Sequence, residues 1–261
     1  MKRMFKLAVL AGAVLSMASC DKNDDQQVAG IFKGPESAFH DGKAFSWVQI
    51  SNQGKPEKLG ITIDKAAWES LPVGGDGSHD HANSVTLKLH EKALATTVFK
   101  HIGLDWNPAG HEPANVYTLP HFDFHYYLMN EPDRLAIPPY EVNPAGFDAK
   151  PAAEFFPVNY FDPGGGVPQM GKHWLDATSP ELGGATFTQT FIYGSYNGKV
   201  NFMEPMVTRQ FIESQPAYER AIPQPAKFQE SGYYPTKMRI RHTAHATEVT
   251  LEDFIYRQKA N

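Results

Sequence analysis

The chain has 261 residues, enough for one large domain or two small ones with a substantial hydrophobic core. Its 24 basic and 29 acidic residues give a net charge of −5, and no arginine-rich helix or basic run occurs. This charge pattern predicts no nucleic-acid partner. The 21 glycines and 20 prolines interrupt the sequence too often for long helices, which excludes a helical bundle or a coiled coil.

The first twenty residues have the layout of a signal for export. A basic segment (1–6) precedes an apolar stretch (7–15), and Cys20, the only cysteine, stands where the cleavage site is expected. Residues 17–20 (MASC) resemble a bacterial lipobox, in which the cysteine becomes the diacylated N-terminus. The alternative is a plain secreted protein in which the cysteine is incidental.

The lipobox resemblance predicts a signal peptide (1–19), a lipid-anchored acidic tether (20–28) and a mature domain (29–261). It implies that the protein lies in the cell envelope, anchored to the lipid membrane through acylated Cys20. The expected membrane is the outer one, with the protein on its periplasmic or its surface face. The acidic residues that follow the cysteine resemble a surface-export signal. With no second cysteine, the exported chain forms no internal disulfide and no thiolate metal site.

Beyond this segment, β-branched and aromatic runs alternate with glycine, proline and polar residues, as is typical of strands joined by turns. Asp64 is predicted to cap a short helix over 65–70, which Pro72 ends. A glycine-rich polar loop over 74–83 follows. The segment 98–106 fits a strand or a helix equally well. The other strands predicted in this half are 44–50, 59–63, 84–89 and 120–129.

The second half contains the clearest local signal, an Asn197-Gly198 pair between two strand-like runs. This pair is typical of a two-residue type I′ hairpin turn, and it predicts a register that pairs Phe191 with Glu204. The other elements predicted here are hairpin strands over 186–196 and 199–206, short elements over 132–168, an extended stretch over 233–249 and a terminal helix over 251–258.

Together these elements predict a β-rich fold, mainly an antiparallel barrel or sandwich, with a few short helices. We expect residues 29–261 to form a single domain. A division into two domains near 144–157 is the alternative, because prolines are frequent there.

The run 121–127 (HFDFHYY) carries the residues best suited to chemistry. Four aromatic residues in seven favour a strand, on which alternate side chains point to opposite faces. Three of the four rings, at 122, 124 and 126, then face the core, while His121, Asp123, His125 and Tyr127 form a polar line on the other face. Two histidines that flank an aspartate offer the imidazole nitrogen and carboxylate oxygen ligands of zinc and other divalent ions.

The spacing of side chains along a strand allows a single metal ion to bind only one of the two histidines. Side chains at i and i+2 lie about 6.6 Å apart on a strand, whereas those at i and i+4 lie about 13 Å apart. One ion can therefore bind Asp123 with either His121 or His125, unless the strand bends. A helix would bring both histidines together, but the aromatic alternation favours a strand. The alternatives without a metal are a solvent-facing polar strand and a hydrogen-bonded network.

Glu204 ends an otherwise apolar strand face, where an unpartnered carboxylate is costly to bury. Its predicted partner is an arginine, a histidine or a metal ion; otherwise it lies at the sheet rim and reaches water. His111 precedes the 121–127 strand, and His173 lies beside a tryptophan in a Gly/Pro-rich loop. Both are candidates for the same site, with simple surface exposure as the alternative. The weaker candidates are His79, His81, His242 and His245.

Three blocks of sequence, GHEPANVYTLPHFDFHYY (110–127), MGKHWLD (170–176) and TFIYGSYNGKVNFMEPMVT (190–208), together resemble an uncharacterised family of bacterial exported proteins with a domain of unknown function. The resemblance covers about residues 29–215 and names no activity. It implies that six candidate residues fall inside the signature blocks of the family: His111, His121, Asp123, His125, His173 and Glu204.

The sequence therefore predicts a lipid-anchored envelope protein with one polar pocket that holds a divalent metal ion, zinc or iron. Such a site suits metal-dependent hydrolysis or non-haem oxygenase chemistry. Signatures of serine nucleophiles and of nucleotide-binding loops do not occur. The predicted metal ligands are His111, His121, His125, His173 and Glu204, and the predicted catalytic carboxylates are Asp123 and Glu204.

Two hypotheses without catalysis remain open at this point. One is a binding module for a small molecule or a partner, and the other is a structural envelope protein whose His–Asp network fixes the fold. Either is compatible with a homo-oligomer. In the binding module, four aromatic residues would line the ligand surface: Trp106, Tyr117, Tyr127 and Trp174.

Overall fold

The computed structural model describes residues 29–75 and 83–260. The predicted signal peptide, Cys20 and the acidic tether therefore lie outside the described residues, as do His79 and His81. In the described parts of the chain, no helix is both long enough and apolar enough to span a bilayer.

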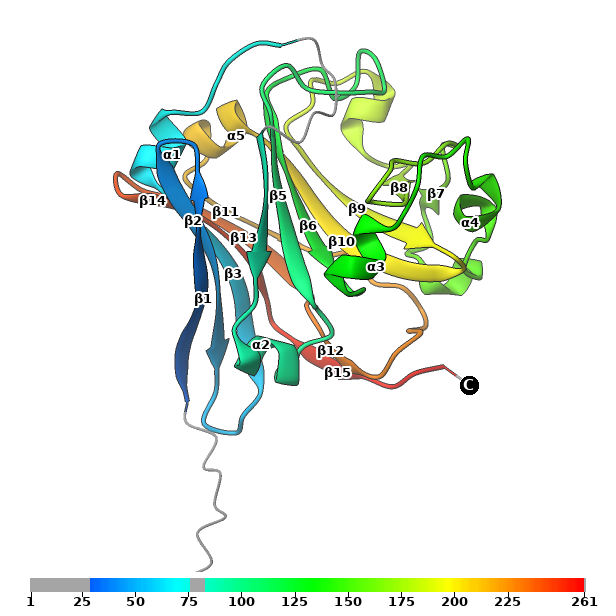
Figure 1. The fold of residues 1–261 in the computed structure, drawn as a ribbon, viewed down its shortest axis with the longest axis horizontal. Helices are drawn as coiled ribbons and strands as arrows, with labels where there is room; N and C mark the ends of the chain where they lie inside the picture. Colours follow the sequence, from blue (N-terminus) through cyan, green and yellow to red (C-terminus); the bar gives the residue numbers. More distant parts are fainter. Residues whose placement is uncertain (1–28, 76–82, 261) are drawn as a thin grey trace, which may run out of the picture.

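Antiparallel strands form two large sheets and one small ribbon. In Figure 1 the six-stranded sheet, in blue, cyan and orange-red, lies beside the seven-stranded sheet, in green to yellow. The six-stranded sheet consists, in spatial order, of β1 (Gly30–Phe39), β2 (Gly42–Ile50), β3 (Pro56–Asp64), β14 (Ala246–Glu252), β13 (Lys237–His242) and β11 (Ala217–Ala221). The seven-stranded sheet consists of β4 (Ser84–Lys88), β5 (His101–Asn107), β6 (His121–Tyr127), β10 (Lys199–Thr208), β9 (Gln189–Tyr196), β8 (Lys172–Asp176) and β7 (Tyr160–Phe161). The ribbon consists of β12 (Gly232–Tyr234) and β15 (Ile255–Arg257).

The helices are short and lie between the strands in sequence. Asp64 caps the first of them as predicted, because its Oδ1 atom accepts a hydrogen bond from Ala67 N at 2.8 Å. They are α1 (Lys65–Glu69), α2 (Glu91–Thr96), α3 (Glu131–Leu135), α4 (Pro144–Asp148), α5 (Arg209–Ser214) and the 3₁₀ turns η2 (Ala153–Phe155) and η3 (Pro180–Gly183).

The predicted β-rich class is confirmed, in its sandwich form. Neither large sheet closes on itself within the described chain, so the barrel alternative is wrong. One hydrophobic cluster takes residues from both sheets, among them Leu59 and Val249 from one and Phe122 and Phe124 from the other. A second, smaller cluster covers the outer face of the seven-stranded sheet, and Phe202 belongs to it.

The predicted hairpin at Asn197-Gly198 is present, and both turn residues have the positive φ angles (49° and 74°) of a type I′ turn. Its predicted register is wrong beyond Val200. A bulge between Val200 and Phe202 shifts the pairing by one residue, so that Glu204 lies opposite Ile192 and not opposite Phe191. This shift places the carboxylate on the outer face of the sheet.

The predicted terminal helix over 251–258 is also wrong. Its first residues belong to β14, and Tyr256 pairs with Tyr233 in the β12–β15 ribbon. Pairing with a distant strand outweighs the weak helix preference of a segment with β-branched and aromatic residues. The ambiguous segment 98–106 forms most of strand β5.

Candidate metal centre

Strand β6 places three predicted site residues on the outer face of the seven-stranded sheet. Phe122 and Phe124 belong to the core between the two sheets, so His121, Asp123 and His125 point to the opposite side. Every residue of β6 is buried. The alternative of a solvent-facing polar strand is therefore wrong, because loops cover this face of the sheet.

The first triad consists of His111, His121 and Asp123. The carboxylate lies between the two imidazoles: His111 Nε2 is 3.2 Å from Asp123 Oδ2, and His121 Nε2 is 3.2 Å from Asp123 Oδ1. Asn107 also donates a hydrogen bond to Oδ2 at 2.8 Å. The His111 side chain, from the loop between β5 and β6, is 10 % exposed, whereas the other two members are almost fully buried.

Backbone carbonyl groups orient both histidines of the first triad. His111 Nδ1 lies 2.6 Å from Glu112 O, and His121 Nδ1 lies 2.7 Å from Leu119 O. A carbonyl oxygen only accepts hydrogen bonds, so Nδ1 carries the hydrogen and Nε2 of the neutral ring carries a lone pair. That lone pair faces Asp123, whose oxygens also only accept. A cation, either a proton or a metal ion, is therefore required between them.

The second triad consists of His125 from β6, His173 from β8 and Glu204 from β10. His125 Nε2 lies 3.5 Å from Glu204 Oε1, and His173 Nε2 lies 3.7 Å from Glu204 Oε2. The Glu204 side chain is 1 % exposed, so the alternative in which it reaches water at the sheet rim is wrong. The His173 side chain is 20 % exposed and is the most open member of either triad.

Close packing around Phe202 supports the second triad. The Phe202 ring centre lies 4.9 Å from that of His125 and 5.0 Å from that of His173. The ring occupies space next to Gly194, where an added Cβ atom would lie only 2.0 Å from Phe202 Cε1. Glycine at position 194 is therefore required for the ring to pack against both histidines.

Asp105 orients His125 and was missed in the sequence. Its Oδ2 atom lies 3.0 Å from His125 Nδ1, an arrangement typical of metal-binding histidines. Asp105 and Asn107 both lie on β5, opposite Asp123 and His121, and both contact the triads. Assigning 98–106 as a strand, and extending it by one residue to Asn107, would have placed these two side chains on the same face as the polar line.

Asp105→Ala is expected to weaken metal binding at the second triad by about 10–100-fold, because the His125 ring loses the partner that fixes its orientation. Isothermal titration of the metal-free variant with zinc would measure the change. The first triad serves as the internal control, and its affinity should stay unchanged. Equal weakening at both triads would show a general structural defect instead.

Burial and neighbouring charges set the pKa values in the two triads. Burial alone would lower the pKa of His111 and of His125, but the adjacent carboxylates outweigh it and raise the pKa of His125 to about 9. Burial would raise the pKa of Asp123, yet its two imidazole neighbours hold it well below its usual range. Burial disfavours the charged form of Glu204, and the nearby His125 offsets only part of this effect, so the pKa of Glu204 rises to about 8.

The spacing of the ligand atoms fits a metal ion in each triad. One ligand atom from each of the three residues lies within 4.8 Å of the other two. Tetrahedral ligands with bonds of about 2.0–2.1 Å lie roughly 3.3 Å apart, close to the nitrogen–oxygen distances of 3.2–3.7 Å in the triads. Four buried atoms of the two triads have no hydrogen-bond partner among the described residues: His121 Nε2, Asp123 Oδ1, His125 Nε2 and Glu204 Oε2.

All six predicted residues therefore lie on one face of the sheet, but they form two groups and not one pocket. Asp123 and His125 stand two residues apart on β6, which separates the triads by about 6.6 Å along the strand. Asp123, the predicted catalytic carboxylate, lies between the two histidines of the first group.

The aromatic residues expected to line a ligand surface are packed inside the protein. None is more than 8 % exposed, so the binding-module hypothesis in that form is wrong. The two tryptophans also use their indole N–H groups inside the protein. Trp106 donates a hydrogen bond to Pro72 O, and Trp174 donates one to Ser195 Oγ. The four residues are Trp106, Tyr117, Tyr127 and Trp174.

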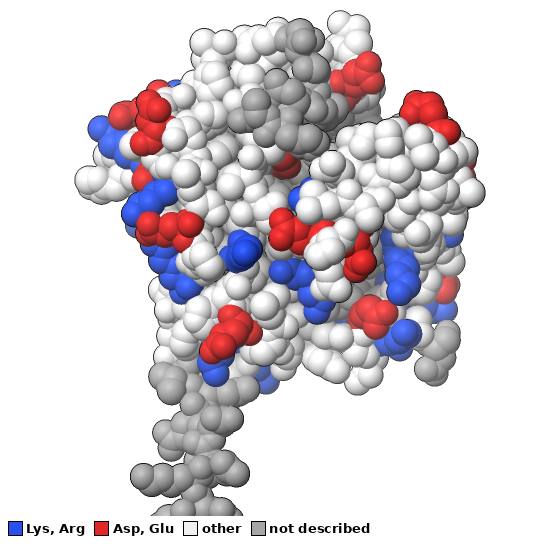
Figure 2. All heavy atoms as spheres, viewed as in Figure 1, with Lys and Arg blue, Asp and Glu red and all other residues white. Residues whose placement is uncertain are grey.

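The remaining histidines named above that the structure describes lie outside both triads. His242 contacts the Trp68 ring and Thr247 on the six-stranded sheet, and His245 is exposed. Figure 2 shows acidic and basic side chains interspersed over the face in view, with no large patch of either sign.

Comparison with known proteins gives one partial match. A family model described as TTHB210-like (hypothetical protein TTHB210) matches residues 51–106, a stretch that includes Asp105 but ends before both triads. It covers less than half of the chain and names no activity. No curated protein and no solved structure shows significant similarity.

Proposed function

We propose that this protein binds divalent transition-metal ions at the two triads, and that the ion at the second triad activates water for hydrolysis. One observation supports the metal sites above all: histidine Nε2 atoms converge on two buried carboxylates, at distances that a bound ion would bridge. Two imidazoles and a carboxylate are the ligands that zinc and iron prefer.

The proposed hydrolysis follows from the number of ligands, three in each triad, and is assigned to the second triad because His173 is the most exposed of these ligands. A structural zinc site has four protein ligands, whereas a catalytic site has three and leaves a position for water. A bound zinc ion would lower the pKa of such a water to about 7. One oxygen of Glu204 would bind the ion, and the other would accept the proton from the water. The partly exposed His173 marks the side from which a substrate would enter.

Non-haem iron chemistry is the second candidate, because two histidines and one carboxylate also form the ligand set of ferrous oxygenases. The two candidates differ in the metal that supports turnover and in their use of oxygen. Both place the reaction at the second triad.

Activity assays with metal-free protein would test the proposal. Zinc-loaded protein is expected to hydrolyse at least one member of a panel of chromogenic esters, phosphodiesters and peptides. His173→Ala should abolish that activity, while His111→Ala, in the first triad, should retain it. Oxygen consumption by ferrous-loaded protein, with no zinc-dependent hydrolysis, would favour the iron alternative. Failure of both reactions with a metal-loaded protein would overturn the catalytic proposal.

Zinc binding at pH 7 is expected to release at least one proton per ion at the second triad. The raised pKa of His125, about 9, means that the metal-free site holds a proton where the ion must bind. Glu204, whose pKa is raised to about 8, also holds a proton at pH 7, so affinity should rise more than tenfold per pH unit up to about pH 8 and about tenfold per unit from there to pH 9. Titration calorimetry in two buffers of different ionisation enthalpy would count the protons released. A count of zero would contradict a protonated His125 in the metal-free site.

We also propose that the protein is anchored to the cell-envelope membrane through an acylated Cys20. The proposal rests on the basic, apolar and MASC segments at the start of the chain. The full-length protein should fractionate with membranes and incorporate labelled palmitate in a bacterial host. Cys20→Ser should abolish labelling, and unchanged labelling would contradict the anchor.

A further inference from the structure

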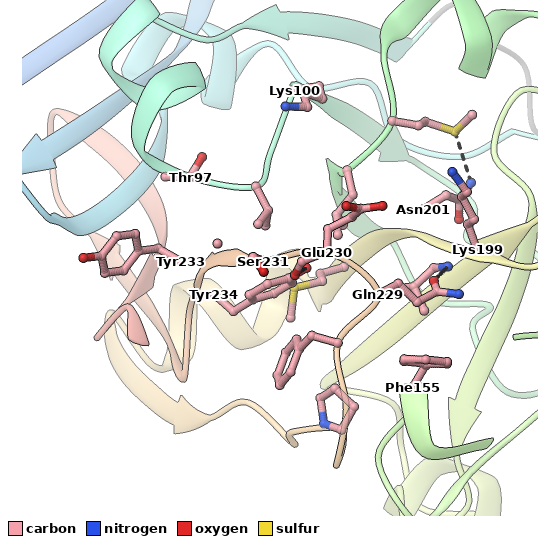
Figure 3. Close-up of a pocket in the computed structure, with 18 of the residues that line it drawn as sticks. Thr97, Lys100, Phe155, Lys199, Asn201, Gln229, Glu230, Ser231, Tyr233 and Tyr234 are labelled. Carbon is pink, nitrogen blue, oxygen red and sulfur yellow. Dashed lines mark hydrogen bonds between the residues drawn. The ribbon is translucent and has the colours of Figure 1, made fainter. Parts of the chain in front are cut away.

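A large cleft lies outside the two triads, and no triad residue lines it. Its volume is about 1240 Å³, above the roughly 300–1,000 Å³ typical of pockets for small ligands. It lies where β6 ends and β10 begins, against the segment that leads into the β12–β15 ribbon. Figure 3 shows Tyr233, Lys100 and Lys199 on three different sides of it.

Lysines that form no ion pair with a described residue gather in this cleft. Nine of the fourteen lysines in the described chain form an ion pair. Three of the remaining five line the cleft: Lys55, Lys100 and Lys199. Of the acidic residues in the lining, Glu230 pairs with Lys259 at 3.7 Å, and Asp133 accepts a hydrogen bond from Asn130. The cleft therefore has an excess of positive charge, in a chain with a net charge of −5.

Aromatic rings are the second feature of the cleft. Tyr233 and Tyr256 stand opposite each other in the β12–β15 ribbon, with ring centres 5.2 Å apart in an edge-to-face arrangement. Tyr256 is 50 % exposed, and Tyr233 is half-buried. Both rings line the cleft, as does Phe155. Open aromatic faces and hydroxyl groups of this kind suit ligands with an apolar face and a polar edge.

The side-chain amides of Gln53, Asn130 and Asn197 also line the cleft and are exposed to solvent. The amides of Gln53 and Asn197 carry both donors and acceptors, and the Asn130 amide keeps one donor and its acceptor besides its bond to Asp133. This matches the alternating donor and acceptor character of neighbouring hydroxyl groups. Rings, amides and lysines thus occur together around one volume.

We infer that this cleft binds a short acidic oligosaccharide, with sugar rings stacked on the tyrosines, hydroxyl groups bonded to the amides and carboxylates paired with the lysines. A single small anion would fill only part of the volume. A long polyanion such as nucleic acid is disfavoured, because the chain carries an excess of acidic residues outside the cleft. The site is separate from the metal centre and does not depend on a bound ion.

Titration calorimetry with tetragalacturonate would test the inference, on metal-free and zinc-loaded protein in parallel. Saturable binding is expected in both, and at least tenfold weaker binding of the neutral maltotetraose. The Lys100→Gln/Lys199→Gln double variant should weaken tetragalacturonate binding at least tenfold. The matched control, Lys88→Gln/Lys92→Gln, changes two lysines that also lack an ion pair but lie outside the cleft, and it should bind like the wild type. Tyr256→Ala should weaken binding at least threefold, which separates ring stacking from charge alone.

Several outcomes would overturn the inference. One is the absence of saturable binding of tetragalacturonate at millimolar concentration. Another is equal weakening by the cleft variant and the control variant, which would show a general charge effect. Tighter binding of an eight-residue oligothymidylate than of tetragalacturonate would point to single-stranded nucleic acid instead.

Discussion

Zinc is expected to raise the thermal stability of the metal-free protein by roughly 10–20 °C. The folded chain holds the triad ligands in place, whereas the unfolded chain does not, so binding favours the folded state. At a free zinc concentration one hundred times the dissociation constant, each occupied site adds about 2.7 kcal/mol to the free energy of unfolding. For a domain of this size, each kcal/mol corresponds to about 2–4 °C. Thermal unfolding followed by circular dichroism, with and without zinc, would measure the shift.

Single-triad variants provide the control for this shift. His111→Ala and His173→Ala each remove the most exposed ligand of one triad, so they disturb the core least. Each should retain about half of the zinc-induced stabilisation, and the double variant should show almost none. An equal shift in the wild type and the double variant would mean that zinc acts elsewhere on the protein.

Asp123→Ala is expected to lower the free energy of unfolding of the metal-free protein by about 3–5 kcal/mol. The substitution leaves two buried imidazoles without the carboxylate that faces both of them. The pKa of Asp123 lies well below its usual range, so at pH 7 the carboxylate is fully ionised and its contribution is fully present. This contribution should be lost progressively as the pH falls below the usual pKa of an aspartate and through the lowered pKa. Urea denaturation at pH 7 in the presence of a chelator would measure the change.

Glu69→Ala is the matched control, because Glu69 forms an exposed ion pair with Lys65 at 3.2 Å. Exposed pairs contribute about 0–1 kcal/mol, so this variant should unfold close to the wild type. A loss below about 1 kcal/mol for Asp123→Ala would show that the first triad carries no buried charge in the metal-free protein.

The sequence alone predicts which side chains of β6 point to each face of the sheet, because side chains on a strand alternate with a fixed period of two. That period separates Phe122 and Phe124 from His121, Asp123 and His125, as the structure confirms. The same spacing argument, that one ion cannot take both histidines of the strand, matches their division between two triads.

The position of Glu204 could not be predicted in the same way. The turn at Asn197-Gly198 fixes the register only up to Val200, and the bulge that follows has no clear sequence signal. Without the bulge, Glu204 would pair with Phe191, as the turn alone predicts. With it, the carboxylate faces His125 across the β6–β10 pair.

The contribution of His173 depends on contacts that are distant in sequence. Strand β8 pairs with β9 only through a short register that includes His173 and Gly194. Such pairing is set by packing of the whole sheet and not by local preference. Asp105 was missed because the apolar residues of segment 98–106, which contains it, follow neither a clear strand period nor a clear helix period.

Native mass spectrometry of protein purified without chelators or affinity metal, then titrated with zinc, tests the central claim most directly. Two ions are expected per wild-type chain, one in the His111→Ala/His121→Ala variant, one in the His125→Ala/Glu204→Ala variant, and none when the substitutions are combined. Circular dichroism would verify that each variant is folded. A folded wild-type protein that binds no ion, or variants that bind as many ions as the wild type, would contradict the two metal sites.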